Sequence, residues 1–294
     1  MSEEVKKMVL TQTGFSRLRA CPKMFKIMNI EGYKQREESE NLSFGTMWHK
    51  MKEMENTGAS LDEICAYAYR EATNEQHAPK LCGMHRAHVA RRNYGKLSGT
   101  EIQFEHVLIN PDTGRPAHKA IMAGKIDGLL IDQDTGEQWI VEYKTASDLS
   151  GAYISRISLD LQVHIYKLAE EKASNQSVVG VIYDAIKKPT IRLKKNETQE
   201  EYEMRVVEWY NTNAQDAFYC ACVRLDDRDI ERQAWMYYQE ILWRLQHDYW
   251  PRNSNQCLNH YGTRCPLFGY CDSGDKQHVL DQDFVKTTLN PELQ

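Results

Sequence analysis

The residues best able to do chemistry lie in one stretch, Gly124–Lys144 (GKIDGLLIDQDTGEQWIVEYK). Its first part carries Asp127 among aliphatic residues, and its last part carries Glu142 and Lys144 two positions apart. The letters DQDTG between the two parts have the composition of a turn. We expect a β-hairpin in which Glu142 and Lys144 share one face with Asp127, while Tyr143 points to the other face. Two carboxylates and one ammonium group would then meet at one edge of a sheet.

This set of side chains suits metal-assisted hydrolysis of a phosphodiester. Mg²⁺ and Mn²⁺ bind a few carboxylate oxygens together with water and phosphate oxygens. The ion polarises the phosphoryl group and generates hydroxide from bound water. A neighbouring lysine orients that water or offsets the developing negative charge. A solvated hairpin with charged residues outside and aliphatic residues inside gives the same pattern, so the assignment depends on residues elsewhere.

Composition describes an ordinary globular protein. The 294 residues are 41% hydrophobic and 27% charged, which allows one large domain or two small ones. No apolar run approaches the roughly 20 residues that span a bilayer. The start, MSEEVKKMVL, lacks the apolar core of a signal peptide. We expect a cytoplasmic protein (host cytoplasm if viral) without membrane contact, whose eight cysteines are thiols or metal ligands.

Charge is unevenly distributed along the chain. A net charge of −5 argues against a purely electrostatic nucleic-acid binder. However, Gln76–Thr100 and Ala185–Asn196 contain basic residues and no acidic residue. Either run alone could be a solvated face, but together they favour contact with phosphates. The candidate DNA-binding residues are Arg86, Arg91, Arg92, Lys187, Lys188 and Arg192.

Hydrophobic periodicity predicts alternating helices and strands and therefore an α/β fold with a mixed central sheet. The predicted helices are Thr11–Met28, Gly45–Glu55, Leu61–Ala72, Pro79–Leu97, Leu159–Ala173, Glu200–Asn213 and Asp227–Gln246. Besides the hairpin, the predicted strands are Glu101–Ile109, Ser177–Ile186 and Ala217–Leu225. We expect a mainly helical part over residues 1–100, a core over 101–250 and a C-terminal segment over 251–294, integrated into one domain. The polar tail beyond Asp272 is expected to be loosely ordered.

Two further motifs lie on predicted helices. Gln162 and Tyr166 are four residues apart and share one helical face. His49 lies in a helix with a stripe of methionines. Taken alone, Gln162 and Tyr166 are typical of a surface residue and a core anchor, and His49 is typical of a packed core histidine.

Taken together, these motifs resemble the RecB-type branch of the PD-(D/E)XK nuclease superfamily over residues 11–271. In that branch a helical histidine precedes an aspartate, an ExK strand and a QxxxY helix. The corresponding positions here are His49, Asp127, Glu142, Lys144, Gln162 and Tyr166. The resemblance implies a restriction-endonuclease-like sheet flanked by helices.

The resemblance also implies a role for each residue. Asp127 and Glu142 would bind the catalytic Mg²⁺ or Mn²⁺, with the backbone carbonyl of Tyr143 nearby and His49 as a further ligand. Lys144 would position the attacking water.

The remaining residues of the motif would form the surroundings of the metal. Gln162 and Tyr166 would shape the site and contact the DNA backbone. An acidic position upstream in the branch matches Glu101, although Glu105 is close enough to leave the choice open.

The cysteines give a second, independent signal. Cys257, Cys265 and Cys271 lie in one loop near the C-terminus, and Cys21 precedes a proline near the N-terminus. Four thiolates suit a [4Fe-4S] cluster, although Cys₄ is also a structural zinc set and free thiols are a third reading. RecB-type relatives such as CRISPR-adaptation nucleases and AddB-type helicase-nucleases have one N-terminal and three C-terminal cysteines, which favours the cluster.

This sequence departs from those relatives in one spacing. The gap between Cys257 and Cys265 is longer than the common CxxC, as in the looser form found in nucleases of phages and mobile elements. The cluster would act as a structural staple between the two ends of the chain.

The other cysteines are expected to have different roles. Cys65, Cys220 and Cys222 are predicted to be core thiols. Cys82, His85 and His88 are spaced like metal ligands, but no fourth ligand is apparent.

The resemblance implies a metal-dependent DNA nuclease, and most RecB-type relatives thread a DNA end. We therefore expect an exonuclease that acts on single strands or duplex ends in recombination, repair or the processing of phage or mobile-element DNA. A helicase, a recombinase or a single-strand-binding protein is a possible partner. The alternatives are an endonuclease and a catalytically idle iron–sulfur module for DNA binding or scaffolding. The sequence has no phosphate-binding glycine loop, so we expect no ATP-driven motor in this chain.

Overall fold

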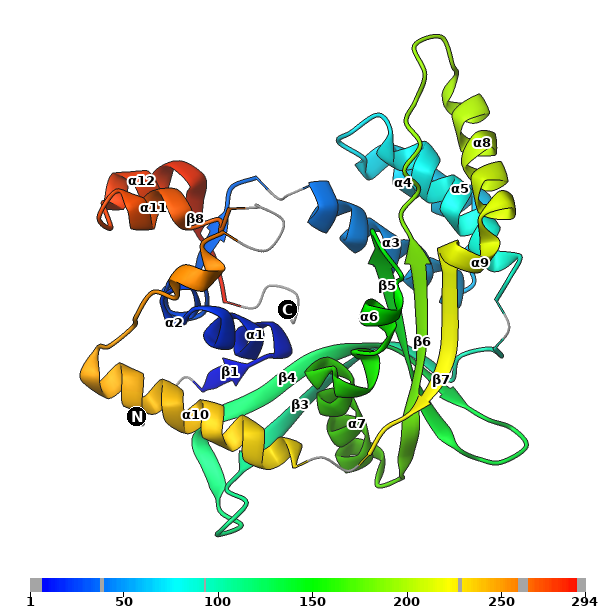
Figure 1. The fold of residues 1–294 in the computed structure, drawn as a ribbon. Helices are drawn as coiled ribbons and strands as arrows, with labels where there is room; N and C mark the ends of the chain where they lie inside the picture. The colour runs from blue at the N-terminus through cyan, green and yellow to red at the C-terminus, as the bar shows by residue number, and fades with distance from the viewer. Residues whose placement is uncertain (1–6, 38–39, 93, 227–228, 259–263, 290–294) are drawn as a thin grey trace. The chain divides into compact units, whose positions relative to one another are not determined.

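The computed structural model describes residues 7–37, 40–92, 94–226, 229–258 and 264–289 (Figure 1). Its strands are β1 (Met8–Leu10), β2 (Tyr33–Gln35), β3 (Gly99–Ile109), β4 (Pro116–Ile131), β5 (Gln138–Ala146), β6 (Val178–Lys187), β7 (Phe218–Arg224) and β8 (Phe284–Lys286). Its α-helices are α1 (Gln12–Ala20), α2 (Pro22–Phe25), α3 (Glu40–Asn56), α4 (Leu61–Glu71), α5 (His77–Val89), α6 (Gly151–Ile154), α7 (Leu161–Ser174), α8 (Gln199–Thr212), α9 (Ala214–Ala217), α10 (Ile230–His247), α11 (Phe268–Asp272) and α12 (Gln277–Asp283). A π-helix follows α2 at Lys26–Ile30, and 3-10 turns lie at Ile157–Leu159 and Ser254–Gln256.

The chain forms two compact units. The first unit comprises residues 1–38, 103–124 and 228–294, and the second comprises residues 39–102 and 125–227. Strands β3 and β4 contribute residues to both. Each unit is therefore built from segments far apart in the sequence, which differs from the predicted division at residues 100 and 250.

The sheet is mixed, and the predicted α/β class is confirmed. Its strand order is β1-β4-β5-β6-β7, with β3 also paired to β4. Strand β4 runs parallel to β1 and antiparallel to β5, while β6 runs parallel to β5 and antiparallel to β7. Helices α3, α4, α5 and α7 of the second unit flank β5 and β6 (Figure 1).

The predicted hairpin is β4 and β5. Gly128 pairs with Val141 in this ladder, which brings Asp127 beside the ExK residues. In the turn, the Asp132 carboxylate accepts two backbone N–H bonds of 2.9 and 2.8 Å, and Gly136 has a φ of +72° that favours glycine. The hairpin prediction is confirmed, including its turn.

The two faces of β5 have different partners. Trp139, Val141 and Tyr143 belong to a buried apolar cluster with residues of α3, α4, α5 and α8. Glu142 and Lys144 point to the opposite face, where α7 provides their partners. This alternation places the charged residues on one face and keeps the other face available for the core.

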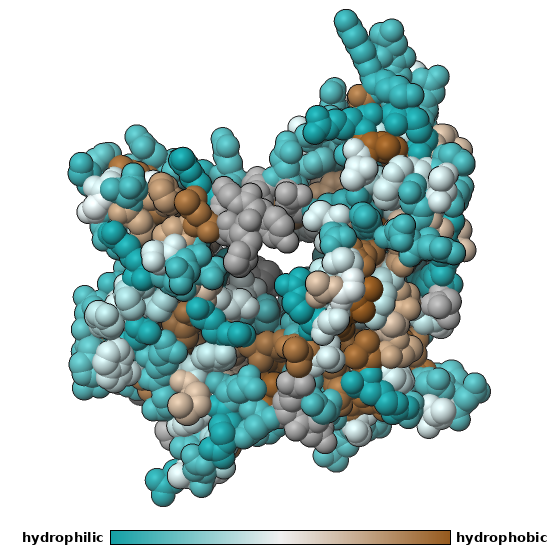
Figure 2. All heavy atoms as spheres, viewed as in Figure 1, coloured by the Kyte–Doolittle hydropathy of each residue, from teal (hydrophilic) through white to brown (hydrophobic). Residues whose placement is uncertain are grey.

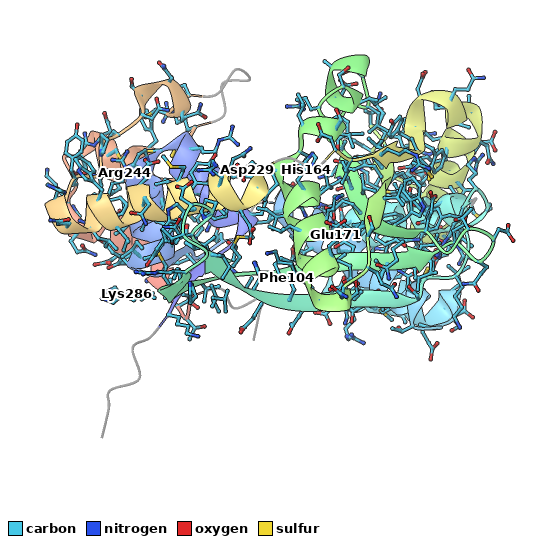
Figure 3. All side chains as sticks on the ribbon, turned by 90° about the horizontal axis from the view of Figure 1, so that it is seen from below. Phe104, His164, Glu171, Asp229, Arg244 and Lys286 are labelled. Carbon is cyan, nitrogen blue, oxygen red and sulfur yellow. The ribbon has the colours of Figure 1, made fainter. Side chains whose placement is uncertain are left out.

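Helix α7 is held in place near both of its ends. Its N-cap Asp160 accepts a hydrogen bond from the backbone N–H of Gln162. His164, labelled with Glu171 in Figure 3, has its Nε2 2.9 Å from the carbonyl oxygen of Ser158. The Glu171 carboxylate accepts a 2.9 Å bond from the first backbone N–H of β6. These anchors fix which face of α7 is turned toward β5.

A close helix contact in the second unit gives a testable prediction of stability. A Cβ on Gly83 of α5 would lie 2.7 Å from Val206 Cγ1 and 2.9 Å from the Glu203 carbonyl oxygen of α8. The backbone of α8 would have to shift to make room for this Cβ. We therefore expect Gly83→Ala to destabilise the protein by about 1–3 kcal/mol, despite the better helix propensity of alanine. Denaturant unfolding measures this, with Gly151→Ala as the control, because a Cβ there meets no atom within 4 Å. A neutral Gly83→Ala would contradict the tight α5–α8 contact.

The polar tail is more ordered than the sequence predicts. Helix α12 and strand β8 lie beyond Asp272, and β8 pairs antiparallel with β2. Leu280 and Phe284 are buried against Ile27 and Leu267 in a small core of the first unit. The prediction of a loose tail was wrong because two apolar residues in a polar segment are enough to dock it.

Three further expectations can be compared with the structure. Cys65 is buried as predicted, whereas Cys220 and Cys222 are exposed, because β7 is the last strand in the sheet order and has no partner strand beyond it among the described residues. The predicted helix Pro79–Leu97 begins at His77 and ends at Val89. No described helix is long and apolar enough to cross a membrane.

Candidate active site

The ExK residues and the QxxxY residues meet on one face of β5. Gln162 Nε2 donates to Glu142 Oε1 at 2.8 Å, and Lys144 Nζ donates to Gln162 Oε1 at 3.0 Å. Lys144 also forms an ion pair with Glu142. Gln162 Nε2 also donates to the Tyr166 hydroxyl oxygen at 2.8 Å, so the Tyr166 side chain lies beside the ExK residues. The four residues thus form one hydrogen-bonded group.

Asp127 and His49 complete the group. The Asp127 carboxylate accepts a 2.9 Å hydrogen bond from the backbone N–H of Tyr143. The same oxygen lies 3.2 Å from Nδ1 of His49, which is carried by α3. The structure therefore brings together all six residues of the sequence motif, from α3, β4, β5 and α7.

Burial sets the electrostatics of this group. Glu142 is 0% exposed, and burial together with the Asp127 charge raises the pKa of Glu142 to about 7. Burial would also raise the pKa of Asp127, but His49, Lys144 and the Tyr143 N–H hold it below its usual value. Burial lowers the pKa of His49 and of Lys144, yet the adjacent carboxylates outweigh it and raise both.

The carboxylates fit a hard divalent cation. Oε2 of Glu142 is buried without a hydrogen-bond partner among the described residues, which is costly for a carboxylate. Asp127 adds a second buried carboxylate whose charge repels the first. In the described part of the chain, no group of three or more His, Cys, Asp or Glu side chains is placed to hold a metal ion by itself. A cation beside Glu142 would satisfy the unpartnered oxygen and offset the repulsion.

The group opens into a cavity of about 500 Å³ in the second unit. His49, Asp127 and Lys144 line it, together with Glu101 and three lysines, Lys50, Lys125 and Lys188. Lys50 and Lys125 were missed in the sequence. The position of Lys125 could have been predicted from the sequence, because it lies two residues before Asp127 on the same strand and therefore on the same face.

The two upstream acids lie in different surroundings. Glu101 lines the cavity and forms an ion pair with Lys125, whereas Glu105 is exposed and does not line it. Glu101 also has a φ of +51°, a left-handed conformation that costs a non-glycine residue on the order of 1 kcal/mol or more. Burial raises the pKa of Glu101 against the effect of Lys125.

The predicted DNA-binding arginines have partners within the protein. Arg86 pairs with Glu203 at 2.6 Å, and Arg92 pairs with Glu55 at 2.9 Å. Arg91 donates to the carbonyl oxygen of Ala87 and to Asn211. Most of α5 is buried. Although this run contains no acidic residue, acidic residues of other elements pair with Arg86 and Arg92. These contacts favour a structural role for the three arginines.

The second basic run is different. Lys188 lines the cavity, and Arg192 is exposed, while Lys187 is half-buried at the end of β6. The segment between β6 and α8 forms hydrophilic surface at the top right of Figure 2. Contact of this run with phosphates stays a prediction.

The cysteines at the two ends of the chain are neighbours in the first unit. Asn253 Nδ2 donates to the Ala20 carbonyl oxygen at 2.8 Å, next to Cys21. The Cys265 backbone N–H donates to the Cys257 carbonyl oxygen at 2.9 Å. Burial raises the pKa of Cys265, and the charges of Cys21 and Cys257 raise it further.

The fourth cysteine lies at the same place. Burial raises the pKa of Cys271, with an added contribution from Cys265, while Lys23 and Arg252 oppose it. None of the eight cysteines, all of which lie in the described part of the chain, forms a disulfide. Residues 259–263 of the loop lie outside the described residues, and no group of three or more metal-binding side chains is placed to hold a metal ion among those described. Ligation of a metal cluster by these four thiols therefore stays a prediction.

Cys82, His85 and His88 do not form a metal site. His85 Nε2 lies 2.9 Å from Glu55, His88 Nε2 lies 2.9 Å from Asp184, and Cys82 Sγ lies near the Cys65 carbonyl oxygen. Their side chains contact three different partners.

Comparison with known proteins gives a family. No curated protein matches the chain. A solved structure titled "Crystal structure of SSO0001" is 14% identical over 82% of this chain and 78% of that chain, with a TM-score of 0.34, which is too distant to inform the site. The model of the PD-(D/E)XK nuclease superfamily matches residues 9–272. The chain therefore belongs to the PD-(D/E)XK nuclease superfamily.

Proposed function

We propose that this chain is an exonuclease of the RecB-type branch that acts on DNA single strands or ends and carries a [4Fe-4S] cluster. Membership of the superfamily makes it a metal-dependent phosphodiester hydrolase that uses Mg²⁺ or Mn²⁺ and acts on DNA. The observation that carries the site assignment is the buried Glu142, with an unpartnered oxygen, beside Asp127 and Lys144 at a cavity.

Each residue of the site has a proposed role. Asp127, Glu142, His49 and the carbonyl of Tyr143 would hold the Mg²⁺ or Mn²⁺, which supplies a Lewis acid and lowers the pKa of bound water. Lys144 would orient water and offset developing negative charge, and in the metal-free protein Glu142 and Asp127 raise its pKa against the effect of burial.

The remaining residues of the motif position these groups. Gln162 donates to Glu142 and accepts from Lys144, which fixes both side chains at once. Tyr166 packs beside Gln162 and restricts its orientation. Glu101 and Lys125 form an ion pair at the cavity and keep a lysine near Asp127.

The cavity supports a single strand or an end as the substrate. A cavity of about 500 Å³ with lysines in its wall admits one strand more readily than a duplex, and the ammonium groups suit phosphates. Lys187 and Arg192 are proposed as further phosphate contacts of the same segment.

Linear and circular single-stranded DNA distinguish an exonuclease from an endonuclease. We expect Mn²⁺- or Mg²⁺-dependent shortening of an end-labelled linear strand, while a circle of the same sequence stays intact. Cleavage of the circle would make the protein an endonuclease. Binding of both substrates without any product would support the idle module instead.

A further inference from the structure

Tyr143 lies between the two ExK residues, and its ring points away from them. The ring is 1% exposed and belongs to the core beneath β5. Its backbone N–H, in contrast, donates to Asp127 at 2.9 Å. One residue therefore connects the interior of the second unit with a carboxylate of the candidate site.

The Tyr143 hydroxyl is held at a fixed point. Asn56 Nδ2 donates to it at 3.2 Å, and the Tyr94 hydroxyl oxygen lies 3.2 Å away. Tyr94 also donates to the Asp184 carboxylate at 2.7 Å. A tyrosine has one proton to donate, and the carboxylate is the stronger acceptor, so Tyr143 donates to the Tyr94 oxygen.

Charged residues support this hydroxyl pair from beneath. Asp184 is the registered neighbour of Tyr143 on β6, and both of its oxygens lie 2.9 Å from His88 Nε2. His88 Nδ1 lies 3.2 Å from Nζ of Lys52, whose ammonium group stands 4.9 Å from the centre of the Tyr143 ring. Lys52 is 0% exposed.

The same contacts reach α3, the helix that carries His49. Lys52 forms an ion pair with Glu55, and Glu55 is also bonded by His85 and Arg92 at 2.9 Å each. Burial would raise the pKa of Glu55, but these partners hold it well below its usual value, so the carboxylate stays charged. Arg92 also donates to Asn56 at 3.2 Å, and Asn56 in turn donates to the Tyr143 hydroxyl oxygen.

We infer that Tyr143 is a positioning residue for the candidate metal site, and that the polar residues around its ring hold it there. We call these residues the Tyr143 cluster; they are Lys52, Glu55, Asn56, His85, His88, Arg92, Tyr94 and Asp184. The cluster ties α3, α5, β5 and β6 together, so His49, Glu142 and, through the Tyr143 N–H, Asp127 keep a fixed geometry. This inference rests on the proposed function.

Stability alone does not account for such a cluster. Replacing buried ion pairs by apolar side chains of similar volume is often neutral or stabilising, whereas a satisfied polar group fixes one arrangement of its members. Partners behind metal ligands orient those ligands, and their loss commonly lowers metal affinity or activity 10–100-fold. A fixed Tyr143 peptide serves that purpose, because its N–H restricts the Asp127 carboxylate to one orientation.

The test uses Tyr143→Phe, which removes one hydroxyl and leaves every proposed ligand atom in place. We expect its Mn²⁺ dissociation constant, measured in a titration followed by the EPR signal of free Mn²⁺, to rise about 10-fold. The matched control is Tyr202→Phe. Tyr202 is equally buried in the same core, but its hydroxyl donates to the carbonyl oxygen of Ile191, which belongs neither to the six motif residues nor to the Tyr143 cluster. We expect Tyr202→Phe to keep wild-type Mn²⁺ affinity with a similar loss of stability.

The outcomes separate this inference from the proposed function. Unchanged Mn²⁺ affinity in Tyr143→Phe, or an equal loss in Tyr202→Phe, would overturn the inference alone. Wild-type binding no tighter than that of Asp127→Asn would overturn the metal site and the inference with it. If Tyr143→Phe does not fold, Asn56→Ala tests the same hydroxyl from a half-buried position, and it too should weaken Mn²⁺ binding.

Discussion

Replacing Glu142 by glutamine is expected to abolish cleavage and at the same time to stabilise the metal-free protein. With a pKa of about 7 instead of the ordinary 4.5, ionised Glu142 costs the folded state on the order of 3 kcal/mol at high pH. The amide keeps the size of the side chain and removes the charge. Cleavage should fall by about 10³-fold or more, because the carboxylate that faces the metal is lost.

The sign of the pH dependence follows from the raised pKa. Below about pH 4.5 the carboxyl group is protonated in both the folded and the unfolded state, so Glu142→Gln and wild type should be equally stable there. As the pH rises toward 7, the unfolded state ionises first and wild-type stability falls relative to the variant. Denaturant unfolding in EDTA at several pH values measures this difference.

A paired carboxylate provides the control for Glu142→Gln. Both carboxylates are buried and have an ion pair, Glu142 with Lys144 and Glu203 with Arg86 at 2.6 Å. At Glu142, however, burial and the Asp127 charge outweigh Lys144 and raise the pKa, so we expect only Glu203→Gln to destabilise the metal-free protein. Added Mn²⁺ should raise the melting temperature of wild type and of Glu203→Gln, and not that of Glu142→Gln. A Glu142→Gln protein that is less stable than wild type at pH 8 without metal would contradict the electrostatic account of the site.

Replacing Cys265 by serine is expected to remove the proposed [4Fe-4S] cluster and most of the stability of the first unit. As a ligand of the proposed cluster together with Cys21, Cys265 would connect the two ends of the chain. A cross-link that closes so long a loop contributes about 5 kcal/mol in the chain-entropy model. Anaerobically purified wild type should absorb between 350 and 450 nm (the region typical of such clusters) and contain about four irons per chain.

The control is a cysteine that has no expected role in the centre. Cys220 is exposed on β7 in the second unit, so Cys220→Ser should retain the full iron content and melting temperature. Colourless wild-type protein with one zinc per chain would replace the cluster by a zinc site. Full iron in Cys265→Ser would show that this cysteine is not a ligand.

The hairpin and the QxxxY helix of the site could be predicted, because each is encoded by a pattern within a few consecutive residues. The turn composition and the alternation of Glu142, Tyr143 and Lys144 fix which side chains share a face of β5. The spacing of Gln162 and Tyr166 does the same on α7, and hydrogen bonds between the two elements confirm that these faces meet. Periodicity also gave the mixed α/β class.

The features that could not be predicted have a common physical cause: they depend on contacts between residues that lie far apart in the sequence. Glu55 lies three residues from Lys52, but nothing near Lys52 in the sequence indicates its contact with His88 of α5 or the proximity of Asp184 of β6. The arginines of the first basic run likewise find Glu55 and Glu203 on other helices. Burial of Leu280 and Phe284 depends on a small core formed with Ile27, which the polarity of the tail conceals.

The central claim is that Asp127 and Glu142 hold the metal that cleaves DNA. Its most direct measurement compares wild type with Asp127→Asn, after both have been stripped with EDTA, on end-labelled single-stranded DNA with and without added Mn²⁺. We predict that Mn²⁺ restores cleavage by wild type, that EDTA abolishes it again, and that Asp127→Asn gives no product at any Mn²⁺ concentration. Cleavage by Asp127→Asn at the wild-type rate, or by wild type in EDTA, would contradict the claim.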